Sequence, residues 1–201
     1  FLARHGGGHT IPPHAINYRA NIWALHSVGV KCLLAVATVG SIDPAFSPGE
    51  IVLPNQIIDY THGRDNTYYD GVERPVMHID FTHPYTEALR VICKQAAANI
   101  QQPLHDGSVY ACVQGPRLET AAEINRLERD GAGLVGMTGM PEAALARELG
   151  MDYAALCPIA NHAAGRGESE ASIQYEVMMK RLAETMGKVR ASINSDLPVS
   201  L

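Results

Sequence analysis

Short apolar runs alternate with longer segments of helical periodicity along most of the chain. Runs rich in Val, Ile, Leu and Ala have the length of buried strands. They lie at residues 31–40, 49–60, 108–115, 133–139 and 152–161. The apolar, strand-like opening of the chain is predicted as a further strand, which residues 4–9 follow. Strands that are apolar throughout are typical of a mostly parallel sheet covered on both faces.

The segments between these runs have apolar residues spaced three and four apart, which predicts amphipathic helices. The expected helices cover residues 14–29, 118–131, 140–150 and about 168–193. Pro141 suits a first helical turn, and Gly29, Gly131 and Gly150 suit helix ends. We therefore predict one α/β domain over residues 1–201, a three-layer αβα arrangement with a mostly parallel mixed central sheet.

Residues 62–77 are polar and aperiodic, so they are predicted to form a long excursion from the domain. Long loops in compact domains usually serve function or an interface. We expect this excursion to make a contact between subunits.

Composition narrows the class of protein. The 201 residues are 46% apolar and 18% charged, with a formal net charge of -5. This excludes a disordered or fibrous chain, and the mild acidity argues against nucleic-acid binding. No apolar window is long enough to span a membrane, so we expect a soluble protein.

The four cysteines show no paired spacing that would indicate a zinc site or a disulfide framework. Cys32, Cys93, Cys112 and Cys157 are interpreted as small core residues of a reducing compartment. The chain opens at Phe1 without an initiating Met, so we expect an upstream segment.

Polar groups follow several predicted strands, at the sheet edge where α/β proteins bind ligands. Arg4 and His5 stand beside a run of glycines, and Thr38 and Thr138 follow two later strands. A guanidinium, an imidazole, hydroxyls and a nearby helix start together indicate an anion site. The alternatives are a glycine turn, a surface ion pair of Arg4, and Thr138 as a helix cap.

Other chemistries find less support. His5, His9 and His14 lack nearby carboxylates and metal-ligand spacing, so no metal site is expected. Glu142 is interpreted as a first-turn helix acid, not as a catalytic base. The chain has no nucleophile elbow, P-loop or dinucleotide-binding motif.

Three long motifs carry a family resemblance. The stretches FLARHGGGHTIPPHAINYRANIWAL, VQGPRLETAAE and GMTGMPEAALARELG closely resemble the trimeric purine nucleoside phosphorylases. The nearest branch acts on 5′-methylthioadenosine and 5′-methylthioinosine, and the resemblance runs from Phe1 to about Ile193. Family members also carry an upstream strand and a Gly-rich phosphate loop that have no counterpart in these 201 residues.

The resemblance implies a pentosyltransferase that uses inorganic phosphate to cleave a purine nucleoside. It implies a cytoplasmic homotrimer that needs no metal or organic cofactor, with phosphate as co-substrate. Catalysis would rest on Arg4, His5 and Asn161. The matching positions assign phosphate to Arg4, His5, Ala37, Thr38 and Thr138, and the nucleoside to Met137, Asn161, Ala163, Glu119, Leu118, Ile173 and His78.

Asn161 and Glu119 bear on the choice of base. Methylthioadenosine phosphorylases have Asp and a small hydroxyl residue at these positions, whereas oxopurine phosphorylases have Asn and Glu. A carboxamide can donate to O6 and engage N7, and a carboxylate can accept from N1–H. A helix-terminal acid is the alternative interpretation of Glu119, but both positions favour a hypoxanthine-like base.

At the 5′ end, Ile173 offers an apolar contact that suits a methylthio group and leaves a hydroxyl unpaired. His78 matches the family position that reaches a neighbouring subunit's 5′ pocket; an exposed loop histidine is the alternative. We therefore predict phosphorolysis of S-methyl-5′-thioinosine to hypoxanthine and 5-methylthioribose 1-phosphate. The alternatives are a methylthioadenosine or general 6-oxopurine nucleoside phosphorylase, a hydrolytic nucleosidase, and a non-catalytic nucleoside-binding module.

Overall fold

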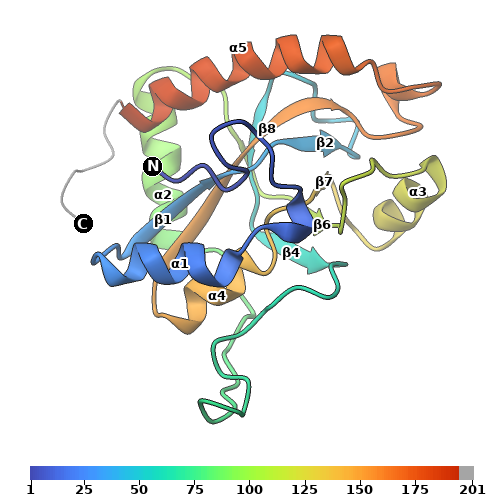
Figure 1. Ribbon diagram of the computed structural model, residues 1–201. Coiled ribbons are helices and arrows are strands. Elements are labelled where there is room, and N and C mark those ends of the chain that lie inside the picture. Colours follow the sequence, from blue (N-terminus) through green and yellow to red (C-terminus); the bar gives the residue numbers. More distant parts are fainter. Residues whose placement is uncertain (195–201) are drawn as a thin grey trace.

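The computed structural model describes residues 1–194. Within this range an eight-stranded sheet has the order β4-β6-β7-β2-β8-β3-β5, with β1 also paired to β8 (Figure 1). The strands are β1 (Cys32–Val36), β2 (Val39–Ser41), β3 (Ile51–Leu53), β4 (Gln56–Asp59), β5 (His105–Asp106), β6 (Val109–Cys112), β7 (Leu134–Gly136) and β8 (Asp152–His162). The β2–β7 and β3–β8 pairs are antiparallel and the other pairs are parallel. The predicted mostly parallel mixed sheet is confirmed.

Helices cover both faces of this sheet. They are η1 (Pro13–Ala15), α1 (Tyr18–Ser27), α2 (Glu87–Asn99), α3 (Ala121–Arg129), α4 (Glu142–Glu148), η2 (Gly167–Ser169) and α5 (Tyr175–Asn194). Alternate residues of β8 serve different cores: Tyr153 and Ala155 lie with α1 and α4, whereas Leu156 lies with Cys93 of α2 and Val189 of α5. This period of two places a helical layer on each side, as the three-layer prediction requires.

Local chemistry starts and stops several helices where the sequence indicates. Thr120 and Glu123 form a reciprocal capping box at the start of α3, and Asn17 caps α1 by accepting from the Ala20 N–H. Gly29 follows α1 with a φ of 87°, in the left-handed region that glycine tolerates best. Glu142 lies in the first turn of α4, as expected.

Two predicted strands are each divided in the structure. The 31–40 run breaks at Ala37 and Thr38 into β1 and β2, which both run along β8. The 49–60 run breaks at Pro54 and Asn55 into β3 and β4, which pair with different strands. Pro54 has no N–H for a ladder, and the Asn55 N–H turns to the Ser108 carbonyl instead.

The prediction that the chain opens with a strand is wrong, because residues 1–3 form no strand. Residues 4–9, expected to follow that strand, form turns, with φ values of 77° at Gly6 and 52° at His9. The glycine turn considered as an alternative is therefore present. The helix α2 was not predicted. The final helix begins at Tyr175, later than expected, because the chain first makes the short turn η2.

The predicted excursion is confirmed. Residues 60–86 form neither helix nor strand, and Figure 1 shows this segment projecting from the body of the domain. Cys93, Cys112 and Cys157 are buried, as expected for core residues, whereas Cys32 is only half-buried, with its thiol 3.7 Å from the Asp152 carboxylate. Among residues 1–194, no helix combines the length and apolar character that a bilayer span requires.

Candidate active site

The sheet brings several predicted site residues to one region. In the register of β2 with its neighbours, Gly40 lies opposite both Val135 of β7 and Asn161 of β8. Thr38 stands two residues before Gly40 on the β2 side, and Met137 stands two residues after Val135 on the β7 side, so both flank this row of paired residues. The strand ends carrying Thr38, Met137 and Asn161 therefore converge.

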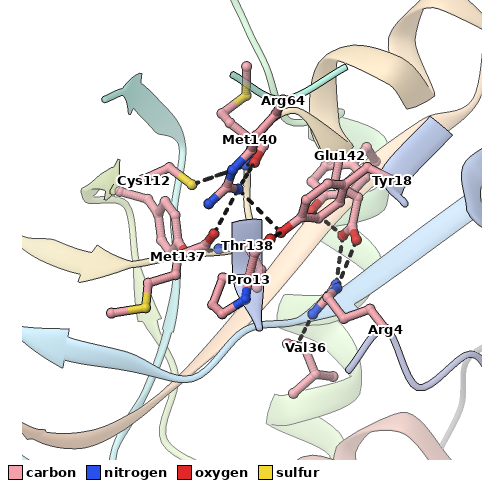
Figure 2. Close-up of polar contacts among 12 residues, drawn as sticks. Arg4, Pro13, Tyr18, Val36, Arg64, Cys112, Met137, Thr138, Met140 and Glu142 are labelled. Atoms are coloured by element: carbon pink, nitrogen blue, oxygen red, sulfur yellow. Dashed lines mark hydrogen bonds and ion pairs between the residues drawn. The ribbon is translucent and has the colours of Figure 1, made fainter. Parts of the chain in front are cut away.

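Arg4 reaches this region from the irregular opening of the chain. Its Nε and Nη2 donate to the two carboxylate oxygens of Glu142 at 2.8 and 2.6 Å, and its Nη1 donates to the Val36 carbonyl at 2.9 Å (Figure 2). The Tyr153 hydroxyl donates to the same carboxylate at 2.9 Å. Arg4 is thereby fixed against the carboxyl end of β1.

The Arg4–Glu142 pair is buried, so the surface ion pair considered as an alternative is not what forms. Side-chain exposure is 15% for Arg4 and 6% for Glu142. Burial alone would lower the pKa of Arg4, but the Glu142 charge outweighs it and holds that pKa above its ordinary value. A guanidinium has five N–H groups, so Nη1 and Nη2 each keep a further N–H for a ligand.

His5 lies next to Arg4 with one ring nitrogen engaged. Its Nδ1 is 2.9 Å from the Ile11 carbonyl, and its ring stacks on His9 with centroids 4.3 Å apart. Burial, His9 and Arg4 lower its pKa. Because a carbonyl cannot donate, Nδ1 carries the proton, and a neutral His5 presents Nε2 as an acceptor. Such a ring can bind the hydroxyl of hydrogen phosphate.

The other residues predicted to bind phosphate differ in whether their polar groups are free to bind an anion. The Ala37 N–H donates to the Leu156 carbonyl at 3.0 Å, so it is used within the sheet. Thr38 is exposed, and Thr138 is buried four residues before α4. The Thr138 N–H lies 3.3 Å from the Tyr110 hydroxyl. The two threonine side chains remain the better candidates for binding an anion.

Met137 packs against the turn that follows β6. A Cβ on Gly115 would lie 2.4 Å from the Met137 Sδ, and Gly115 has a φ of 63°. Both facts require glycine at this position. The segment leading to Glu119 therefore rests directly on Met137.

Arg64 is the main residue that sequence reasoning missed. Although it belongs to the excursion, its side chain reaches the ends of β6 and β7. It donates to the carbonyls of Met137 and Met140 (Figure 2) and to those of Val113 and Gln114. Its guanidinium also lies over the Tyr18 ring, 5.3 Å from the centroid. An isolated arginine in a polar, aperiodic segment gives no pattern that would reveal this placement.

The two predicted base-recognition residues have contrasting environments. Asn161 is half-buried, and its Nδ2 donates to the His162 carbonyl at 2.6 Å. Glu119 is half-buried, and burial raises its pKa above the ordinary value despite the nearby Arg117. A carboxylate in such a position is poorly solvated and favours a ligand that donates a hydrogen bond.

The remaining nucleoside residues are dispersed. Ala163 is buried beside Gly40, Leu118 is exposed after the Gly115 turn, and Ile173 is half-buried before α5. His78 is exposed on the excursion, and no described contact joins it to Arg4, Glu119 or Asn161.

Two hollows lie elsewhere in the described part of the chain. One of about 570 Å³ opens at the amino ends of β6 and β7, away from Arg4 and Asn161, and no cationic residue lines it. The other, of about 380 Å³, contains Arg147 and His83, but Asp80, Glu87 and Asp152 also line it, so it is not a predominantly cationic site. In the part of the chain that the structure describes, no three His, Cys, Asp or Glu side chains gather as a possible metal site.

Comparison with known proteins gives consistent matches. The model of the phosphorylase superfamily matches residues 1–193. A Pseudomonas syringae pv. tomato protein named probable S-methyl-5′-thioinosine phosphorylase is 52% identical over 200 residues, covering 100% of this chain and 80% of that protein. The 6-oxopurine nucleoside phosphorylase of Pyrococcus furiosus is 47% identical, covering 96% of this chain and 76% of that protein.

A solved structure is also similar to this chain. Methylthioadenosine phosphorylase from Schistosoma mansoni, in complex with adenine, matches with a TM-score of 0.91 at 32% identity, covering 96% of this chain and 73% of that one.

The burial of the Arg4–Glu142 ion pair predicts how its loss affects stability. Glu142→Gln leaves the Arg4 charge buried without its counter-ion, which should lower the free energy of unfolding by about 3–5 kcal/mol. Urea denaturation measures the change. Glu168→Gln is the matched control, since its partner Arg181 is 33% and Glu168 itself 60% exposed, and an exposed pair contributes about 1 kcal/mol or less. Equal losses of unfolding free energy in the two variants would contradict the interpretation of Arg4–Glu142 as a buried, stabilising ion pair.

Proposed function

This chain belongs to the phosphorylase superfamily, and we propose that it cleaves a purine nucleoside with inorganic phosphate, acting best on S-methyl-5′-thioinosine. The products are hypoxanthine and 5-methylthioribose 1-phosphate. Such an enzyme is a pentosyltransferase whose co-substrate is phosphate. The relative named probable S-methyl-5′-thioinosine phosphorylase, 52% identical over the whole chain, supports this proposal.

The phosphate reacts at the sugar. A phosphate oxygen forms a bond to C1′ as the bond from C1′ to N9 breaks, and the electron pair of that bond leaves with the purine. The spare Arg4 N–H groups, His5 Nε2 and the hydroxyls of Thr38 and Thr138 hold the phosphate below the sugar, while Met137 packs against the ribose. Fixing phosphate next to C1′ supplies much of the rate enhancement.

The leaving purine gains negative charge that must be relieved at N7. A proton taken up at N7 neutralises this charge, and Asn161 is the residue assigned to hold that form: its Oδ1 accepts from N7–H while its Nδ2 donates to the purine O6. Its Nδ2 must then exchange the His162 carbonyl for O6. Stabilising charge that develops only as the bond breaks lowers the barrier to reaction.

The observation that carries the choice of base is the half-buried Glu119 carboxyl with its raised pKa. Hypoxanthine carries a proton on N1 that can satisfy this acceptor. Adenine presents a lone pair at N1 instead, so binding it would place two acceptors against each other. Ala163 and Leu118 complete the base side in this proposal.

The 5′ side separates the leading proposal from a second candidate. Ile173 would contact the methylthio group, which favours S-methyl-5′-thioinosine over inosine. A general 6-oxopurine nucleoside phosphorylase is the second candidate, because the Pyrococcus furiosus relative of that name is 47% identical.

We also propose that the enzyme works as a cytoplasmic homotrimer. His78 is exposed on the excursion, where it can extend to the 5′ pocket of a neighbouring copy. Three buried free cysteines are typical of a protein kept in a reducing compartment.

The first test compares nucleosides and phosphate. Purified enzyme should cleave S-methyl-5′-thioinosine with a higher kcat/KM than inosine or S-methyl-5′-thioadenosine, and only when phosphate is present. Release of the free base measures each rate. Turnover that persists undiminished in phosphate-free buffer would identify a hydrolase, and preference for the 6-amino nucleoside would refute the roles of Asn161 and Glu119.

Asn161→Asp should shift preference toward adenine nucleosides. An aspartate accepts from the 6-amino group but repels O6, so the ratio of kcat/KM for the 6-oxo and 6-amino substrates should fall by about tenfold or more. Asn125→Asp on α3 provides a control for the same chemical change away from the site. An unchanged ratio in Asn161→Asp would remove this residue from base recognition.

The raised pKa of Glu119 predicts a pH dependence. The ionised carboxyl accepts from N1–H more strongly than the protonated one, so kcat/KM for S-methyl-5′-thioinosine should fall as pH drops through a pKa above the usual glutamate value. Glu119→Gln should lose this acidic limb and have a lower plateau. A profile that keeps the limb in Glu119→Gln would assign it to another group.

A further inference from the structure

We propose that Arg64 is a positioning residue that holds the base-recognition turn against the ribose-binding segment and so determines discrimination between 6-oxo and 6-amino purines. The inference rests on the proposed function and extends it to a residue outside the set proposed to contact substrate and phosphate.

Arg64 joins two segments that the sheet itself does not join. Its Nη1 donates to the carbonyls of Met137 and Met140 at 2.9 and 2.5 Å, and its Nη2 donates to that of Gln114 at 3.0 Å. A longer contact of 3.4 Å reaches the Val113 carbonyl. Figure 2 shows the guanidinium between Met137, Met140 and Tyr18, whose hydroxyl lies 3.2 Å from Nη1.

These contacts begin where the ladder between β6 and β7 stops. The last paired residues are Cys112 and Gly136, followed by a hydrogen bond from the Val113 N–H to the Gly136 carbonyl. Beyond this point the two segments separate, and their carbonyls need other hydrogen-bond donors. The Arg64 guanidinium donates to carbonyls of both segments at once.

The two segments lead directly to proposed site residues. Gln114 precedes the Gly115 turn and then Glu119, while Met137 precedes Thr138. The close contact between Gly115 and the Met137 side chain means that a shift of one segment displaces the other. Arg64 therefore controls the position of Glu119 relative to the sugar.

Arginine suits this position better than lysine. Its planar group presents N–H donors in fixed directions, whereas a lysine ammonium is a single point of charge. The Arg64 side chain also donates from Nε toward the Gln114 Oε1 at 3.3 Å. A lysine cannot reproduce simultaneous contact with the ends of β6 and β7.

The experiment measures a ratio that loss of folded protein leaves unchanged. In Arg64→Met, the kcat/KM ratio of S-methyl-5′-thioinosine to S-methyl-5′-thioadenosine should fall about tenfold. Arg64→Lys keeps the charge and provides a second variant; its ratio should also fall. In a Glu119→Gln background, Arg64→Met should change the ratio little, because both changes act on the same contact.

The matched control is Arg74→Met, on the same excursion. The Arg74 guanidinium lies over Trp23 and Tyr69, 5.3 and 5.8 Å from their ring centroids, and makes no described contact with the ends of β6 and β7. Its ratio should equal that of the unaltered chain. An unchanged ratio in both Arg64 variants, or an equally large effect in the Glu119→Gln background, would overturn the proposal.

Hydrogen exchange tests positioning without relying on the reaction. Arg64→Met should exchange faster at residues 113–119 and 137–140, and Arg74→Met should not. If the unaltered chain fails to prefer the 6-oxo nucleoside, the proposed function fails whatever the exchange shows. If that preference is present but exchange in these segments is unchanged, the role of Arg64 alone is refuted.

Discussion

The ion pair between Arg4 and Glu142 fixes the irregular opening of the chain to the folded domain. Residues 1–9 contribute no strand, so the position of Arg4 depends on side-chain contacts with α4 and β1. Glu142 in turn has the Tyr153 hydroxyl as a further donor. A charge removed from water is tolerable only when its partners are as fully satisfied as these. The same contacts therefore serve both the fold and the placement of the proposed phosphate ligand.

Arg64 has the corresponding role on the nucleoside side of the proposed site. Both arginines come from irregular segments and reach carbonyls at strand ends, where the ladder no longer pairs the backbone. The sheet thus supplies a rigid frame, and side chains from outside it set the spacing of the site. The excursion carries Arg64 toward its own domain and His78 outward, so in the proposed trimer one segment would serve two sites.

The layered fold could be predicted because apolar runs and helical periodicity are local signals. The predictions that failed concern features that depend on contacts between residues far apart in the sequence. The break at Pro54 separates β3 from β4 because each finds a different neighbour in the sheet. The 1–9 segment has strand-like composition, yet left-handed residues and the attraction of Arg4 for Glu142 determine its path.

The site residues fall into the same two groups: those in local motifs could be predicted from sequence, and those placed by distant contacts could not. Motifs containing Arg4, Thr138 and Glu119 could be identified from sequence because each lies in a long recognisable stretch. Arg64 could not, since its importance comes from contacts with residues about 50 and 73 positions away, at Gln114 and Met137. No local pattern encodes a contact between an aperiodic loop and two strand ends.

The pairing of Arg4 with Glu142 also bears on how phosphate would act as a nucleophile. Because Glu142 already balances the Arg4 charge, the proposed site holds phosphate through directed N–H and O–H groups more than through net positive charge. The dianion then keeps more of its negative charge for the sugar, which becomes cationic as the bond to the purine breaks. An interaction that strengthens along the reaction lowers the barrier, whereas strong neutralisation of bound phosphate would stabilise only the ground state. In the proposed site, the buried carboxylate would thus contribute to reactivity by limiting how tightly its neighbouring arginine holds phosphate.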